Sequence, residues 1–187
     1  MQILFVCSGN TCRSPLAKAA WDAFGPNLLK QSRLGRELLV GMSAASGGLA
    51  AAPGMPATAH ARTIARGWGV SLDKHRSRDI DSGMAAGAEL LCAMTPEQVE
   101  IVRCRFPEAA PRVHLLAGFS FDETRDSNAA RLLPLMSDLG WDETGSEGPC
   151  IFDPFGGSIE AYQACAAHIK RSVEGLGMAL ATGQLKL

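Results

Sequence analysis

Val6-Cys-Ser-Gly-Asn-Thr-Cys-Arg-Ser-Pro15 stands between two segments with different hydrophobic periodicity. Before it lies the short apolar run Gln2–Val6, which is rich in β-forming residues and predicts a buried strand. After it, Ser14–Phe24 places apolar side chains at helical spacing, and Pro15 suits a first helical turn because a proline needs no hydrogen-bond partner there. The quoted residues are therefore predicted to form a loop that joins a strand to a helix.

The alternation of strand and helix continues beyond this first unit. Further strands are predicted at Glu37–Ser43, Glu89–Met94 and Val113–Phe119. Further helices are predicted at Thr58–Trp68, Pro96–Phe106 and Ser158–Leu180, with a Gly/Pro-rich loop at 46–57. Strands that alternate with helices indicate an α/β fold with a parallel sheet and right-handed crossovers. The 187 residues suffice for a full-sized core, so we expect a single domain over 1–187.

Residues 120–149 depart from this alternation. They are polar and hold seven acidic side chains against two arginines. A loop of this length is unusual inside a compact domain and is typically functional or mobile. We expect an acidic insertion or lid here, with a short helix near Asn128–Leu139.

Composition excludes several classes of function. The formal net charge of −1 gives no global field for nucleic acid. No apolar run approaches the ~18 residues that a membrane helix needs, and the first residues do not have the pattern of a signal peptide. The six cysteines are scattered without the rhythm of a disulfide framework. We therefore expect a cytoplasmic protein with no nucleic-acid or membrane partner.

The loop after the first strand has the features of a phosphate site. In a doubly wound α/β protein, ligands bind beyond the carboxyl ends of the strands, where this loop lies. Successive backbone N–H groups and a helix N-terminus together attract an anion. Gly9 permits close approach of the backbone, Asn10 tolerates the left-handed conformation, and Arg13 can bind two phosphate oxygens. The predicted phosphate-binding residues are Ser8, Gly9, Asn10, Thr11, Cys12, Arg13 and Ser14.

Cys7 adds a nucleophile to this site. It stands at the first position of the loop, where the positive field favours a thiolate at neutral pH, and the Ser14 hydroxyl can donate a hydrogen bond to the sulfur. A thiolate at the floor of a phosphate cradle is placed to attack phosphorus and form a cysteinyl-phosphate. Arg13 and the loop N–H groups would stabilise the equatorial oxygens as charge redistributes.

Cys7 through Pro15 resembles the signature loop of the low-molecular-weight protein tyrosine phosphatases. A second landmark of that family, an Asp-Pro-aromatic loop before the last helix, is matched by Asp153-Pro-Phe-Gly-Gly157. The resemblance implies a single three-layer domain, a four-stranded parallel sheet flanked by helices, and hydrolysis in two steps with no cofactor. It also implies phosphorylated proteins as substrates.

The resemblance assigns roles to further residues. Asp153 would be the general acid and then the base, beside the catalytic Cys7 and Arg13. Ser43 and His75 match positions that brace the loop asparagine, so they join Asn10 and Ser14 as expected bracing residues.

Thr11 bears on the substrate. Tyrosine phosphatases of the family usually carry a bulky aliphatic residue at this position. The protein arginine phosphatase branch carries threonine there and ends its acid loop in Asp-Pro-Phe-Gly-Gly, as this chain does. A hydroxyl can bond the donors of a planar guanidinium, whereas an apolar side chain favours a phenyl ring. We expect Thr11 and Phe155 to set specificity, with phosphoarginine as substrate and phosphotyrosine as the alternative.

Other functions compete with this hypothesis. An arsenate reductase would need further redox cysteines at close spacing, and a phosphate-binding module would need neither Cys7 nor Asp153. Cys7 and Cys12 suggest a metal site, but no His or second Cys pair stands nearby at ligand spacing, so we expect no metal. A reversible Cys7–Cys12 disulfide, which the resemblance supports, would protect the nucleophile from overoxidation.

Overall fold

The computed structural model describes residues 1–120 and 150–185, and its centre is a sheet of four strands in the order β2-β1-β3-β4. Both neighbours of β1 run parallel to it, and β4 runs parallel to β3. The strands are β1 (Gln2–Cys7), β2 (Ser43–Gly48), β3 (Leu90–Ala93) and β4 (Val113–Leu115). The segment that carries Cys7 is therefore a central strand, flanked on both sides.

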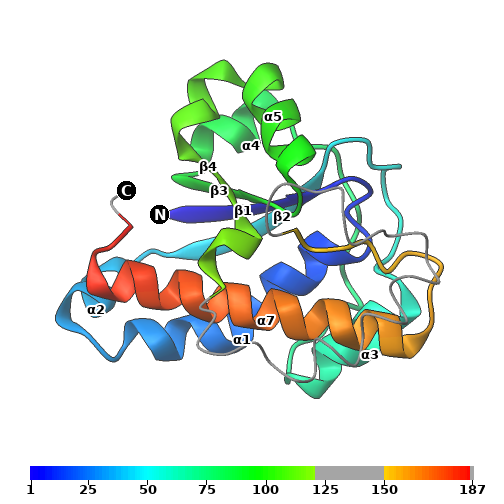
Figure 1. Ribbon diagram of the computed structural model, residues 1–187, viewed down its shortest axis with the longest axis horizontal. Helices are drawn as coiled ribbons and strands as arrows, with labels where there is room; N and C mark the ends of the chain where they lie inside the picture. Colours follow the sequence, from blue (N-terminus) through cyan, green and yellow to red (C-terminus); the bar gives the residue numbers. More distant parts are fainter. Residues whose placement is uncertain (121–149, 186–187) are drawn as a thin grey trace.

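Helices cover both faces of the sheet, which gives the three layers seen in Figure 1. One layer contains α1 (Arg13–Leu29), α2 (Arg33–Leu39), α3 (Ala59–Gly67) and α7 (Ile159–Thr182). The other contains α4 (Ser82–Gly87), α5 (Pro96–Arg105) and the 3-10 helix η1 (Pro107–Arg112), while a second 3-10 helix, η2 (Leu116–Phe119), follows β4. The predicted α/β fold with a four-stranded parallel sheet is confirmed.

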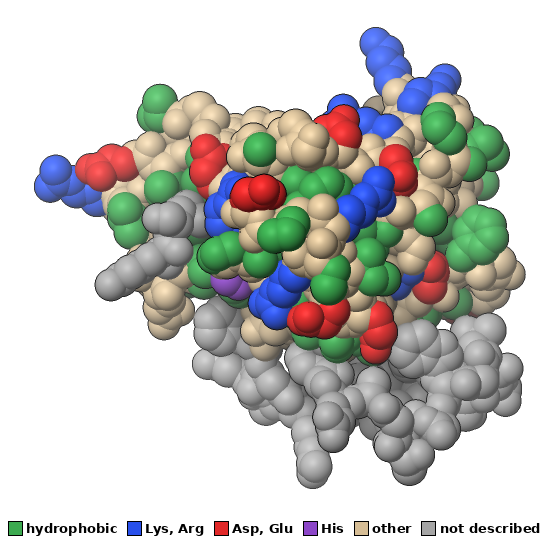
Figure 2. Space-filling view, turned by 90° about the horizontal axis from the view of Figure 1, so that it is seen from above, with side chains coloured by type: hydrophobic (Ala, Val, Ile, Leu, Met, Phe, Trp, Pro, Cys, Tyr) green, Lys and Arg blue, Asp and Glu red, His purple; other side chains and the backbone are tan. Residues whose placement is uncertain are grey.

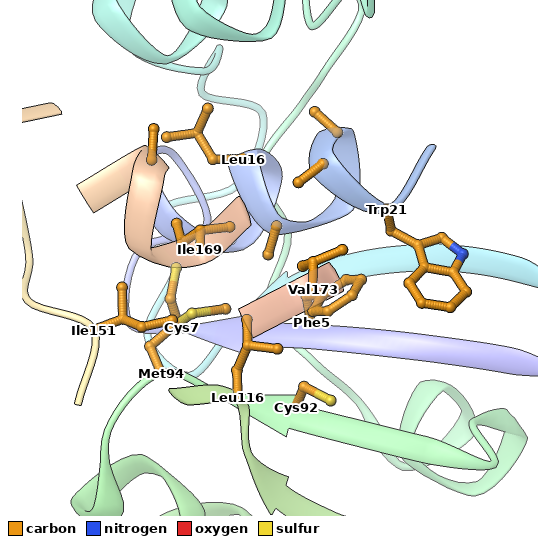
Figure 3. Packing of buried hydrophobic residues seen from close by; sticks show 14 of the residues in the cluster. Phe5, Cys7, Leu16, Trp21, Cys92, Met94, Leu116, Ile151, Ile169 and Val173 are labelled. Atoms are coloured by element: carbon orange, nitrogen blue, oxygen red, sulfur yellow. The ribbon is translucent and has the colours of Figure 1, made fainter. Parts of the chain in front are cut away.

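The core has two halves because β1 is buried on both faces. Alternate side chains of a strand point to opposite faces of a sheet. Phe5 accordingly packs in the same cluster as Leu16 of α1 and Ile169 of α7 (Figure 3), whereas Leu4 packs toward Val102 of α5. Together these two clusters fix β1, and with it the position of the loop that follows.

The strand predicted at Glu37–Ser43 is wrong, because a helix and a later strand share this region. Residues 33–39 form α2, which Ser32 caps by accepting a hydrogen bond from the backbone N–H of Gly35 at 2.8 Å. The true strand, β2, begins only at Ser43 and includes residues 46–48, which were predicted to be loop.

The composition of β2 explains the error. Its sequence, Ser-Ala-Ala-Ser-Gly-Gly, lacks the β-branched and aromatic residues that mark most strands. Close packing requires these small residues: a Cβ on Gly47 would lie 2.3 Å from Cγ2 of Ile80, and a Cβ on Gly48 would lie 2.6 Å from the carbonyl oxygen of Ser8. Tertiary packing therefore overrides strand propensity here.

Smaller differences affect the ends of elements. The predicted fourth strand ends at Leu115 and continues as η2, while the first helix extends to Leu29. Helix α4 has no counterpart among the predictions. The predicted insertion at 120–149, with its helix near Asn128–Leu139, lies outside the described residues apart from Ser120.

The described surface is electrostatically mixed. Lysine, arginine and acidic side chains are interspersed over the face shown in Figure 2, with apolar side chains between them. Within residues 1–120 and 150–185, no helix combines the length and the apolar character needed to cross a membrane.

Gly48→Ala is expected to destabilise the fold next to the phosphate loop. The added Cβ would meet the Ser8 carbonyl oxygen at 2.6 Å and the Ala51 Cβ at 2.8 Å. Overpacking of this kind costs roughly 1–3 kcal/mol. Denaturant unfolding measures the loss, with Gly67→Ala as the control because a Cβ at Gly67 meets nothing within 4 Å. Equal free energies of unfolding for the two variants would contradict the prediction.

Candidate active site

The phosphate loop is the connection between β1, which ends at Cys7, and α1, which begins at Arg13. It lies at the carboxyl end of the central strand, as the doubly wound arrangement predicts. Asn10 has a φ of 53°, in the left-handed region that Asn tolerates better than most residues. The backbone therefore turns sharply at Asn10 and brings the start of α1 back over Cys7.

Cys7 is buried beside two polar groups. Its Sγ lies 3.0 Å from Oγ of Ser14, and the backbone N–H of Asn10 donates to it at 3.3 Å. Oγ of Ser14 also lies 3.1 Å from the carbonyl oxygen of Gly47. Because the hydroxyl has a single proton, it can donate either to this oxygen or to the sulfur, but not to both. When the sulfur is a thiolate, that proton is best directed at Cys7, because a charged acceptor binds it more strongly than a neutral carbonyl.

Asn10 links the loop to its surroundings. Its fully buried side chain donates to Oγ of Ser14 at 2.9 Å and to Oγ of Ser46 at 3.1 Å, and it accepts from the backbone N–H of Arg78 at 3.0 Å. His75 Nε2 lies 2.8 Å from the Asn10 carbonyl, so this nitrogen carries a proton and donates. Burial lowers the pKa of His75, which favours a neutral bracing side chain.

The expected contact between Asn10 and Ser43 is wrong, because Ser46 makes it. Ser43 is the first residue of β2, pairs with Gln2 at the far end of β1, and is exposed. Ser46 lies three residues farther along β2, near the loop end of the strand, and is buried. The misplaced strand prediction caused the misassignment.

Arg13 and Asp153 meet although 140 residues separate them in the chain. The buried guanidinium donates through Nη2 to Oδ2 of Asp153 at 2.5 Å and through Nη1 to the carbonyl of Ile151 at 3.2 Å. Nε of Arg13 is buried and has no hydrogen-bond partner among the described residues. A buried, unpaired donor on a fixed guanidinium suits a phosphate oxygen, because leaving it unsatisfied costs free energy.

Several of these groups line one pocket of about 390 Å³. Its lining residues are Cys7, Ser8, Gly9, Thr11, Cys12, Arg13, Ala50, Ala52, Met55, Asp153 and Phe155. The lining thus contains the predicted nucleophile, clamp, acid and both specificity residues. Phe155 and Met55 are 71% and 50% exposed, so the pocket has two apolar side chains open to solvent.

The Cys12 thiol contacts two hydroxyl groups from other parts of the chain. Its Sγ lies 3.0 Å from the hydroxyl of Tyr162 and 3.6 Å from that of Thr58. The pKa of Tyr162 is raised, mainly because the phenol is buried. The phenol therefore keeps its proton and can donate it to the sulfur of Cys12. Both Cys7 and Cys12 are free thiols, and the reversible disulfide between them stays a prediction.

Sequence reasoning missed several residues that contact the site: Ser46, Met55, Gln98, Ile151 and Tyr162. A correct strand assignment would have pointed to Ser46, because the carboxyl end of β2 adjoins that of β1. The others act through a backbone carbonyl or from within helices and loops, where no motif marks them. Among the residues that the structure describes, no group of three or more His, Cys, Asp or Glu is arranged to hold a metal ion.

Comparison with known proteins agrees with this geometry. The family described as low molecular weight phosphotyrosine protein phosphatase matches residues 2–133. A protein-arginine-phosphatase of Geobacillus stearothermophilus is 31% identical over 183 residues, covering 98% of this chain and 98% of the relative. The low molecular weight protein-tyrosine-phosphatase Etp of Escherichia coli strain K12 is 34% identical over 113 residues, covering 60% of this chain and 67% of the relative.

One of the solved structures similar to this chain contains a phosphorylated active-site residue. It is the YwlE arginine phosphatase in a variant that carries a phosphorylated serine in place of its active-site cysteine. It superposes with a TM-score of 0.70 at 27% identity and covers 96% of this chain and 95% of that one.

A strand-loop-helix phosphate cradle with a cysteine at its floor defines a cysteine-dependent phosphatase, a class of hydrolase. Within this class, the chain belongs to the low molecular weight phosphotyrosine protein phosphatase family.

Proposed function

We propose that this phosphatase removes the phosphoryl group from phosphoarginine in proteins, and that residues 1–187 form one phosphatase domain that acts in the cytoplasm. The observation that carries the choice of substrate is Thr11, which lines the same pocket as Cys7 and Phe155 and stands where a tyrosine phosphatase of the family would present an aliphatic side chain. The relative that matches over 98% of both chains is named protein-arginine-phosphatase, which supports the same choice.

In the first step, the Cys7 thiolate attacks phosphorus and the phosphorus–nitrogen bond breaks. Asp153, protonated for this step, transfers its proton to the departing guanidine nitrogen, so that the leaving group departs neutral. The phosphoryl oxygens accept hydrogen bonds from the loop N–H groups and from Arg13, whose buried Nε has no other partner among the described residues. The product is a phosphoryl group bonded to Cys7.

In the second step, water attacks the phosphorus of this intermediate. Asp153, now a carboxylate, accepts the proton of the water, and the sulfur–phosphorus bond breaks. Inorganic phosphate leaves and the thiolate of Cys7 is restored, stabilised by the hydroxyl of Ser14 at 3.0 Å. The Arg13–Asp153 contact of 2.5 Å supports this assignment, since it keeps the carboxyl group next to the phosphate clamp.

Thr11 and Phe155 supply the discrimination. A guanidine group is planar and covered with N–H donors, and the Thr11 hydroxyl offers lone pairs to them. Phe155, which is 71% exposed, offers a flat apolar face on which that plane can stack. A phenyl ring has no N–H groups for the threonine to bind, so phosphotyrosine would gain from an aliphatic residue at this position.

Thr11→Ile is expected to reverse the substrate preference. Without the hydroxyl, the buried donors of phosphoarginine lose an acceptor, which lowers kcat/KM by roughly 10- to 100-fold on the usual scale of an unsatisfied donor. The added apolar surface favours the phenyl ring. The measurement is kcat/KM of the reduced protein on matched phosphoarginine and phosphotyrosine peptides.

Thr63→Ile is the matched control, because Thr63 is an exposed residue of α3 and does not line the pocket. It is expected to leave the preference of the wild type unchanged. A wild type that prefers phosphotyrosine, with a preference that Thr11→Ile does not alter, would refute the arginine assignment and favour tyrosine phosphatase activity.

A further inference from the structure

Gln98 connects the phosphate loop to the far layer of the molecule. It lies in the first turn of α5, on the face of the sheet opposite α1, and is 6% exposed. Its Oε1 accepts the backbone N–H of Met94 at 3.1 Å, and its Nε2 donates to Oγ of Ser8 at 3.0 Å. Because a backbone N–H can only donate, it fixes the orientation of the amide, and the NH₂ group must face Ser8.

This hydrogen bond restricts the Ser8 hydroxyl. The oxygen has one proton and two lone pairs, and Gln98 occupies one of the lone pairs. The hydroxyl proton cannot point at Gln98, since the amide presents another hydrogen there. Ser8 is exposed and lines the pocket with Cys7 and Arg13, so its proton can turn to a ligand bound in the pocket, or to solvent when the pocket is empty.

The backbone of Ser8 is also fixed. Its carbonyl oxygen accepts the N–H of Ala50 at 3.0 Å, and the carbonyl of Cys7 accepts the N–H of Leu49 at 2.9 Å. Backbone contacts from the segment after β2 and a side-chain contact from α5 therefore hold Ser8 from two directions. This supports a defined position for the hydroxyl at the wall of the pocket.

We propose that Gln98 is a positioning residue that turns the hydroxyl proton of Ser8 away from α5, so that this proton is available to donate to an oxygen of the phosphoryl group bound in the pocket. The inference rests on the proposed site for phosphate, but it does not depend on whether the substrate is phosphoarginine or phosphotyrosine. Inorganic phosphate is therefore a sufficient probe, and its binding requires no turnover.

Gln98→Glu reverses this hydrogen bond with little change in size. A glutamate still accepts the Met94 N–H, but it has no N–H for Ser8 and instead attracts the hydroxyl proton. The dissociation constant of inorganic phosphate, measured by calorimetry on the reduced protein, is expected to rise roughly tenfold or more, as for a lost charge-assisted hydrogen bond. Ser8→Ala is expected to produce a rise of similar size.

A double-mutant cycle separates positioning from simple charge repulsion. If Gln98 acts through Ser8, then Gln98→Glu in the Ser8→Ala background weakens phosphate binding by much less than it does in the wild type. If the new carboxylate only repels phosphate, it weakens binding by the same factor in both backgrounds, and the proposal is overturned. Gln31→Glu, at an exposed residue outside the pocket, controls for net charge and is expected to bind phosphate like the wild type.

The single variant Ser8→Ala keeps the proposal testable even if Gln98→Glu fails to fold. Phosphate affinity equal to that of the wild type in Ser8→Ala would overturn the proposal by itself. A wild type that binds phosphate but hydrolyses no phosphorylated peptide would contradict the proposed function while leaving this inference standing.

Discussion

Cys7→Ser is expected to abolish turnover of every phosphorylated substrate while the protein still binds phosphate. A serine hydroxyl is a far weaker nucleophile than a thiolate, and the groups in hydrogen-bonding contact with Cys7 Sγ, the Ser14 hydroxyl and the Asn10 N–H, include no general base to activate it. We expect kcat to fall by roughly 10⁴-fold or more, the scale on which removal of an essential nucleophile acts. The cradle itself, made of backbone N–H groups and Arg13, is unchanged.

Intact-mass measurement adds a second readout to this experiment. In the YwlE variant whose active-site cysteine is replaced by serine, that serine is phosphorylated. We expect Cys7→Ser incubated with substrate to gain the mass of one phosphoryl group slowly and to release it more slowly still. Cys104→Ser, at an exposed cysteine of α5, is the control and should turn over normally. Full activity of Cys7→Ser would show that Cys7 is not the nucleophile.

Asp153→Asn is expected to have the second largest effect. The amide oxygen can still accept the hydrogen bond from Arg13 that the carboxylate accepts at 2.5 Å, but the NH₂ group then replaces the oxygen that accepts the backbone N–H of Phe155 at 3.2 Å. The amide can neither protonate the leaving group nor accept a proton from water. Loss of a general acid and base lowers kcat by roughly 10²- to 10⁴-fold. Asp73→Asn, at an exposed aspartate away from the pocket, should have little effect.

The dependence on the leaving group distinguishes acid catalysis from a merely structural role. With a series of aryl phosphates, the deficit of Asp153→Asn relative to the wild type should shrink as the leaving group becomes more acidic, because a stable anion needs no proton. A deficit that is constant across the series would mean that Asp153 acts only by holding Arg13 in place.

Sequence alone predicted those parts of the site that form one short contiguous unit. The strand ending at Cys7, the turn at Asn10 and the helix beginning at Arg13 depend on local hydrophobic period, on a residue suited to positive φ, and on proline. The approach of Asp153 was expected from the family's acid loop, and its distance from Arg13 became measurable only in the structure.

Parts of the fold that depend on close packing were not predictable in this way. Strand β2 consists of small residues because Ile80 and the Ser8 carbonyl leave no room for larger ones, so its sequence resembles a loop. That error displaced the bracing serine from position 46 to 43. Gln98 and Tyr162 lie in helices that pack on different faces of the sheet, and no local pattern shows that their side chains reach the phosphate loop.

The contacts of Arg13 also indicate when, during synthesis of the chain, we expect the enzyme to become active. Its guanidinium is held by Ile151 and Asp153, which are 138 and 140 residues later in the chain. Cys7 emerges from the ribosome long before either, and contacts between such distant segments form late because closing a long loop costs chain entropy. A nascent or C-terminally truncated chain therefore carries the Cys7 thiol without a fixed Arg13 guanidinium and without Asp153, the proposed acid. We therefore expect hydrolysis to begin only when the segment that contains Ile151 and Asp153 has folded onto the phosphate loop.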